Sequence, residues 1–165
     1  MNDVAAIFRQ LTLGVYVVGV ARDEQRDAFT AAWVMQVSFA PLLLAVSINP
    51  DNASYPLLHA GGGFTVNVLR RGQLDLARHF GTRSGRDQDK LAGIAWRPGR
   101  NGAPILEEAV AYLDCELRTS LLVGDHVLVI GRVIDGRILT RDAVPRTYAE
   151  TGDMDGSSAL YPTTF

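Results

Sequence analysis

Apolar residues recur along the chain with two different periods, and each period predicts a different kind of element. Residues 4–11 carry apolar side chains at the spacing of one helical face, which predicts a short amphipathic helix with Asn2 or Asp3 as its cap. Two further short helices are predicted at residues 55–60 and 74–80, the first of them ended by three consecutive glycines.

The remaining patterned segments alternate or run continuously apolar, as strands do. The predicted strands are a hairpin formed by 15–20 and 29–39 around a polar stretch at 22–27, a central strand at 42–48 buried on both faces, a strand at 64–69, and a long antiparallel pair at 110–122 and 127–138. Many short strands with few helices favour a closed or partly closed β-barrel, because closure removes exposed strand edges.

Two irregular segments complete the expected organisation. The polar, glycine-containing loop at residues 81–90 is predicted to contact a ligand. The tail at residues 139–165 lacks the periodicity of a second core, so Tyr148, Tyr161 and Phe165 are expected to pack on the barrel or on a second subunit. Residues 1–165 are therefore interpreted as a single domain with a C-terminal tail.

Composition narrows the class of protein. With 165 residues, 47% of them apolar, the chain can build one sizeable core. A net charge of -2 and scattered Lys and Arg residues give no broad basic surface, which makes nucleic acid a poor partner. The start lacks the basic region of a signal peptide, and the apolar run at 15–21 is too short to span a bilayer, so a soluble cytoplasmic protein without membrane association is expected.

Several kinds of site are disfavoured. Cys115 is the sole cysteine, which excludes an internal disulfide and multi-cysteine metal or iron–sulfur sites and suggests a buried structural thiol. The three histidines, His59, His79 and His126, are too dispersed for a zinc motif. Neither a Gly-x-Gly-x-x-Gly between strand and helix nor a Gly-x-Ser-x-Gly is present, which argues against a Rossmann fold and an α/β-hydrolase.

A series of short segments resembles, in order, the flavin reductase-like family of FMN-binding split barrels. The segments are residues 29–33, 38–41, 45–49, 54–55, 64–69, 85, 89–90, 92–96, 102–106 and 124–126. The likeness spans residues 8 to 133. Leu42 departs from it, because the family commonly has a second proline after Pro41. The resemblance implies a mainly β fold with short helices, an antiparallel FMN-binding split β-barrel of Greek-key type.

A flavin requires hydrogen-bond partners along its ring edge, small residues that allow close approach, and donors for its ribityl and phosphate groups. The resemblance places these contacts at Thr30, Ala31, Ala32, Trp33, Ser38, Ser47, Ile48, Asn49, Ser54, Tyr55 and Asn67. Lys90 offers a positive charge for the phosphate. Any one of these Thr, Ser or Asn residues in isolation more often satisfies a turn, and it is their ordered series that favours the flavin interpretation.

His126 is the candidate catalytic residue, in a turn before a strongly apolar strand. In the family this histidine lies near the reaction centre, so the resemblance implies that it orients the hydride donor or stabilises developing charge near neutral pH. Without the resemblance, a turn residue bonded to Asp125 or to nearby backbone is an equally good interpretation. His59 and His79 are expected to be structural.

The resemblance implies an NAD(P)H-dependent flavin reductase that transfers hydride from nicotinamide to FMN, or to FAD. It also implies a homodimer with the flavin near the subunit interface, and a flavin-dependent monooxygenase is a possible partner. Two alternatives stay open: a reductase of ferric chelates or another small acceptor, and an FMN electron-transfer or sensing module without turnover. An open path beside His126 would favour the reductase, whereas enclosure of the flavin by the tail at 139–165 would favour the carrier.

Overall fold

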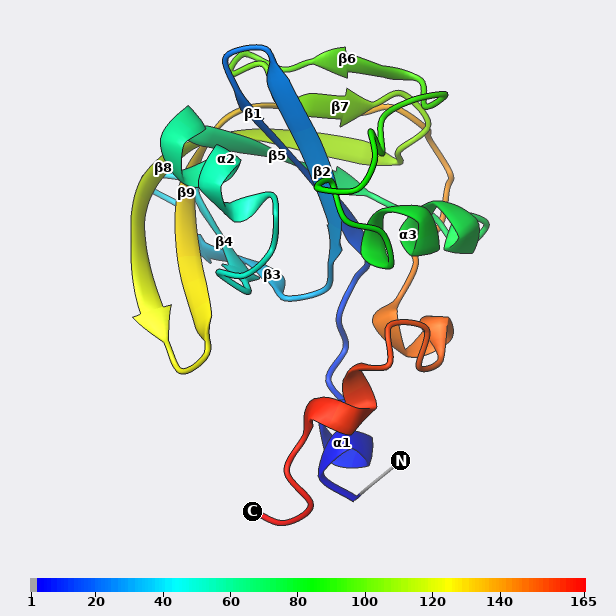
Figure 1. Ribbon diagram of the computed structural model, residues 1–165. Coiled ribbons are helices and arrows are strands. Elements are labelled where there is room, and N and C mark those ends of the chain that lie inside the picture. Colours follow the sequence, from blue (N-terminus) through cyan, green and yellow to red (C-terminus); the bar gives the residue numbers. More distant parts are fainter. Residues whose placement is uncertain (1–2) are drawn as a thin grey trace.

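The computed structural model describes residues 3–165 and is built around one antiparallel sheet (Figure 1). Its seven strands follow the order β2-β1-β5-β8-β9-β4-β3. They are β1 (Tyr16–Arg22), β2 (Gln25–Ala31), β3 (Val34–Ser38), β4 (Leu43–Ile48), β5 (Gly63–Val68), β8 (Ala111–Val123) and β9 (His126–Ile138). A separate two-stranded sheet pairs β6 (Trp96–Pro98) with β7 (Pro104–Leu106).

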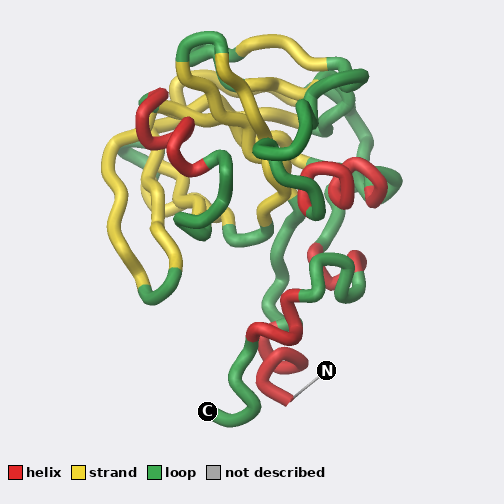
Figure 2. The backbone as a smooth tube through the Cα atoms, in the orientation of Figure 1, coloured by secondary structure: helices red, strands yellow, loops and turns green. Residues whose placement is uncertain are grey.

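The sheet curls until strands near its two ends share one core. Phe29 on β2 and Val46 on β4 belong to the same buried cluster, together with Phe64, Cys115 and Val129 from the strands between them. A curled, antiparallel sheet with short helices outside it is the predicted split barrel, and the fold prediction is confirmed (Figure 2). Among residues 3–165, no helix is both long and apolar enough to cross a membrane.

In the described part of the chain, three α-helices lie outside the sheet: α1 (Asp3–Phe8), α2 (Tyr55–Gly61) and α3 (Leu74–Gly81). Local chemistry explains the bounds of α2. Pro56 stands in its first turn, where the missing N–H costs nothing, and Gly62 ends it in the left-handed conformation with φ 73°. Helix α1 ends at Phe8, shorter than predicted, and Asn2 as a cap lies outside the described residues.

The predicted hairpin at the start of the sheet is wrong in two details. Strands β1 and β2 pair up to Arg22 and Gln25, so the turn consists of Asp23 and Glu24 rather than the whole polar stretch. The segment 29–39 also belongs to two strands. Strand β2 stops pairing with β1 after Ala31, and β3 then pairs with β4. The predicted central strand becomes β4, which is an interior strand but lies second from the edge.

The C-terminal tail runs away from the barrel and ends below it, beside the N-terminal helix (Figure 1). It contains two 3-10 helices, η1 (Tyr148–Thr151) and η2 (Ser157–Leu160). Tyr161 contacts Phe8 on α1, with ring centroids 5.3 Å apart. Tyr148 packs against a second buried apolar cluster, which includes Ala77 and Phe80 of α3. Phe165, by contrast, is 90% exposed. The tail and α1 thus form one arm below the barrel.

Candidate functional site

A cavity of about 370 Å³ lies between one end of the barrel and the tail. The end of β2 and the residues after it form one wall, the end of β4 a second, and the β8–β9 turn with Asp125 and His126 a third. The tail closes the remaining side through Tyr148, Thr151, Met154, Asp155, Ser157, Leu160, Tyr161 and Pro162. The mouths of barrels are frequent positions for small-molecule sites, and this volume is within the usual range.

Most of the predicted flavin contacts line this cavity. The structure brings together Thr30, Ala31, Ala32, Trp33, Ser47, Ile48, Asn49 and His126. Thr30 Oγ1 donates to the Ala77 carbonyl at 2.6 Å, so its hydroxyl also ties β2 to α3. Ala31 and Ala32 line the cavity with methyl groups alone, which would let a flat ligand approach their backbone more closely than larger side chains would.

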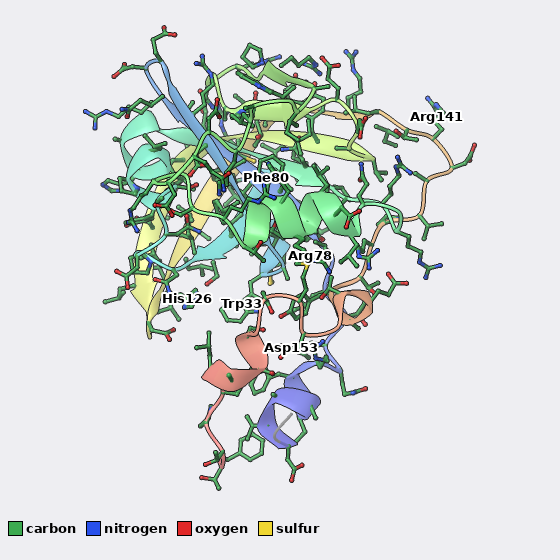
Figure 3. All side chains as sticks on the ribbon, turned by 45° about the vertical axis from the view of Figure 1, so that its right-hand side comes forward. Trp33, Arg78, Phe80, His126, Arg141 and Asp153 are labelled. Atoms are coloured by element: carbon green, nitrogen blue, oxygen red, sulfur yellow. The ribbon has the colours of Figure 1, made fainter. Side chains whose placement is uncertain are left out.

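His126 and Trp33 meet at the rim of the cavity, facing the tail that carries Asp153 (Figure 3). Their ring centroids are 4.9 Å apart, with the planes tilted by 52°. His126 Nδ1 is 2.7 Å from Asp125 Oδ1. The hydrogen bond from His126 is the main cause that lowers the pKa of the Asp125 carboxyl. With Nδ1 donating to this carboxylate, Nε2 of a neutral imidazole is the acceptor.

A second chamber of about 310 Å³ adjoins the first and shares Phe29, Thr30, Asn52 and Gly81 with it. Its wall is the predicted ligand-contact loop, with Arg83, Ser84, Gly85, Arg86 and Lys90 among the lining residues. Arg86 Nη2 donates to the Asp51 carbonyl at 3.0 Å. The two chambers therefore differ in character: the first is lined without lysine or arginine, and the second is cationic.

Lys90 lines the second chamber, but its ammonium is already paired. Its Nζ lies 3.5 Å from Asp27 Oδ1, and the two side chains are 3% and 7% exposed. Ser54 Oγ donates to the other oxygen of Asp27 at 2.7 Å. Burial lowers the pKa of Lys90, against the opposing charge and hydrogen bond of Asp27. The cluster joins β2, the start of α2 and the end of the loop at residues 81–90.

The other predicted cofactor contacts lie apart from the two chambers. Ser38 ends the edge strand β3, and Tyr55 begins α2 and packs against the barrel core. Asn67 is fully buried, where its amide nitrogen donates to the Val17 carbonyl at 3.0 Å and its oxygen accepts from the Leu106 N–H at 2.8 Å. The structure gives Asn67 a role inside the barrel, and Ser54 serves the buried cluster around Asp27.

Sequence reasoning missed two parts of the site. It gave enclosure of the flavin by the tail only as the mark of a carrier and named no tail residue as a ligand contact, because residues 148–162 have no periodic pattern. It also passed over Arg83 and Arg86. Here a signal was present, since both guanidiniums stand in the loop already predicted to contact a ligand.

Comparison with known proteins identifies the family of this barrel and its two-chamber site. The chain belongs to the flavin reductase like domain family, whose model matches residues 8–155. The putative diflavin flavoprotein A 2 of Synechocystis sp. is 37% identical over 140 residues, which is 84% of this chain but 24% of that protein. A high molecular weight rubredoxin of Moorella thermoacetica is 36% identical over 141 residues, or 61% of its length. The chain thus spans about a quarter of the diflavin proteins that it matches.

Solved structures show the same architecture. The NADH:FAD oxidoreductase of Streptomyces globisporus superposes with a TM-score of 0.83 at 28% identity, covering 90% of this chain and 89% of the other. An FMN-binding protein of Thermus thermophilus gives a TM-score of 0.74 at 33% identity, covering 79% and 72%. The chain is therefore similar in fold to an NADH:FAD oxidoreductase and to an FMN-binding protein.

Proposed function

We propose that this domain binds FMN across the two chambers and oxidises NAD(P)H at the exposed side of the flavin. The observation that carries the proposal is the continuity of a partly aromatic chamber, lined without lysine or arginine, with a cationic one. Such a pair suits a ligand with a flat ring system at one end and a phosphate at the other. FAD shares both parts and is accommodated if its adenosine extends outside.

The residues present fit an FMN molecule laid in this direction. The ring would contact Ala31 and Ala32 closely, with Trp33 at its edge, while Ser47 and Asn49 offer hydrogen bonds. The phosphate would be held by Arg83 and Arg86 in the second chamber, because Lys90 is neutralised by Asp27. Lys90 would then shape the phosphate loop rather than bind the phosphate.

When bound, FMN supplies hydride-accepting chemistry that no side chain of the chain possesses. The protein's own task is to place a nicotinamide at reactive distance and to shield the pair from water. His126 stands at the rim with its Nδ1 fixed by Asp125, which orients the ring and leaves Nε2 toward an incoming group. We assign His126 to positioning the nicotinamide and stabilising charge that develops beside it.

A second candidate function, a flavin-holding electron-transfer module, is favoured by one observation. Eight residues of the tail line the cavity, so the flavin would be enclosed on the side away from β4. The diflavin relatives, in which a domain of this kind occupies about a quarter of the protein, are consistent with such a role. If the domain is instead a reductase, it would supply reduced flavin to a monooxygenase or reduce a small acceptor.

We also propose that the domain works as a homodimer. The edge strand β3, the residue that follows it and the β8–β9 hairpin expose large apolar side chains. They include Met35 at 63%, Phe39 at 88% and Leu122 at 74% exposure. An apolar face of this kind is stabilised by burial against a second copy. Sedimentation of the purified protein should therefore give twice the mass of the chain.

One experiment separates the two functions. The FMN-loaded protein is mixed anaerobically with NADH and, separately, with NADPH, while the flavin absorbance is followed in a rapid-mixing instrument. Bleaching within seconds by either nucleotide supports the reductase. A flavin that stays oxidised with both, yet is bleached by dithionite and remains bound during gel filtration, supports the electron-transfer module. Failure of FMN to bind at high micromolar concentration contradicts both.

A further inference from the structure

The tail wall of the cavity is fastened to the N-terminal helix by the side chain of Arg9. Arg9 follows α1 directly, and its own N–H donates to the Ala5 carbonyl at 3.0 Å, which continues the helical turn. From there its Nη1 donates to the Gly152 carbonyl, and its Nη2 lies 3.3 Å from Asp153 Oδ1. The guanidinium also stands 5.6 Å from the centre of the Tyr148 ring, within the range of a cation–π contact.

Exposure distinguishes this contact from an ordinary surface ion pair. The Arg9 side chain is 16% exposed and that of Asp153 is 38% exposed. Exposed ion pairs contribute little, because water and salt screen them and two long side chains must be ordered. A mostly covered guanidinium with a carbonyl, a carboxylate and an aromatic ring as partners is held more firmly than such a pair.

The residues that Arg9 contacts are hydrogen-bonded to other residues of the tail, some of which line the cavity. Asp153 accepts from the Ser158 N–H at 3.1 Å and from the Ser158 hydroxyl, which fixes the start of η2. Tyr148 bonds Ser157 Oγ at 2.6 Å and Asp155 at 3.1 Å through its phenol oxygen. Tyr148, Asp155 and Ser157 all line the flavin chamber. A continuous set of contacts therefore leads from α1 through Arg9 to the inner surface of the site.

We propose that Arg9 is a positioning residue that holds residues 148–162 closed as the wall of the cavity and thereby sets how long a flavin stays bound. The proposal rests on the proposed function in one respect, since it takes the occupant of the cavity to be a flavin. A wall that opens locally gives the ligand a path out, and the opening rate rises when the contacts that close the wall are removed. Because Arg9 lies outside the cavity, it acts only through the tail.

The first arm of the test uses the protein without flavin. Hydrogen exchange of the amides in residues 152–158 is compared between the unaltered protein, Arg9→Met and Arg141→Met. Methionine keeps the unbranched apolar stem and removes the charge and donors. Arg141 is an exposed arginine in the first part of the tail, soon after β9 and far from the cavity, and serves as the matched control (Figure 3). Arg9→Met should exchange about ten-fold faster in this segment, the loss expected for a hydrogen bond to a charged group, and Arg141→Met should not.

The second arm measures FMN association and dissociation by rapid mixing and flavin fluorescence. Arg9→Met should release FMN about ten-fold faster with little change in the association rate. Arg9→Lys, which keeps the charge but not the forked donors, should fall between the two. A general loss of folding would lower the melting temperature and slow association as well, which a change confined to the tail would not.

The outcomes are distinct. Unchanged exchange in Arg9→Met, or faster exchange with an unchanged FMN release rate, overturns the proposal. If Arg9→Met does not fold, Arg9→Lys and Asp153→Asn carry the same comparison, because each weakens the contact while keeping its shape. If the unaltered protein binds no FMN, the proposed function fails, whereas the exchange arm still reports whether Arg9 closes the tail.

Discussion

Replacing Lys90 with methionine should destabilise the protein far more than it weakens phosphate recognition. The substitution leaves the Asp27 carboxylate 7% exposed, with the Ser54 hydroxyl as its hydrogen-bond partner and, among residues 3–165, no cation paired with it. Removing one member of a buried ion pair costs about 3 to 5 kcal/mol, because the other charge stays buried without compensation. Against a total free energy of unfolding of about 5 to 15 kcal/mol for a domain, that loss is large.

A second substitution tests whether the loss of stability in Lys90→Met comes from the unpaired charge of Asp27. Burial lowers the pKa of Lys90 in spite of Asp27, so the pair stands in an environment that disfavours charge. Asp27→Asn removes the negative charge and keeps an acceptor for Ser54. Adding it to Lys90→Met should restore about 2 kcal/mol or more, whereas two independent losses would add.

Urea unfolding followed by tryptophan fluorescence measures the stability of the three variants. Titration with FMN and with riboflavin, at a temperature where each variant is folded, measures phosphate recognition separately. Lys90→Met should weaken both ligands equally, and Arg86→Gln should weaken FMN selectively, because the phosphate is present in FMN alone. The reasoning is refuted if Lys90→Met unfolds like the unaltered protein yet binds FMN about ten-fold more weakly with riboflavin unaffected.

Four further outcomes are expected. His126→Ala should slow flavin reduction by NAD(P)H about ten-fold or more with little change in FMN affinity, measured by rapid mixing and titration of the same variant. Burial raises the pKa of the Cys115 thiol to about 12, so the folded protein should resist a thiol reagent at pH 8. Because unfolded Cys115 ionises at lower pH than folded Cys115, urea titrations above pH 9 should show stability falling as the pH rises toward 12. Burial also raises the pKa of Asp114, whose Oδ1 has no hydrogen-bond partner among the described residues, so Asp114→Asn should add about 1 kcal/mol to the free energy of unfolding at neutral pH, measured by urea titration.

The strands of the barrel were predictable where one face or both faces are buried. The sequence then shows alternating apolar residues in the first case and a continuous apolar run in the second. The long pair β8 and β9 and the helix α2 with its closing glycine were both predicted within a few residues. The turn at Asp23 and Glu24 was misplaced for a physical reason. Polarity usually marks a turn, but Asp27 is polar and lies in β2, where Lys90 and Ser54 from distant segments satisfy its charge.

The candidate site was predictable where its residues sit at strand ends, which barrel topology brings to one rim. Thr30 and Ser47 are far apart in sequence but line the same cavity. The tail wall was not predictable, because its position depends on individual contacts such as those of Arg9 rather than on a repeating pattern. A periodic pattern constrains many residues at once, and a single side-chain contact constrains only the two segments that it joins.

Asn67 shows why residue type alone cannot separate a ligand contact from an interior one. On β5, Phe64 and Val66 point into the barrel core, so Thr65 and Asn67 on the alternate face read as a solvent-facing or ligand-facing pair. The β6–β7 hairpin covers that face instead. Thr65 Oγ1 donates to the Pro104 carbonyl, and Asn67 bonds both that carbonyl and the Leu106 N–H. Side chains of β5 thereby satisfy backbone groups of the short strand β7 that lack a partner in their own sheet. A flavin would have used the same donors and acceptors of these side chains.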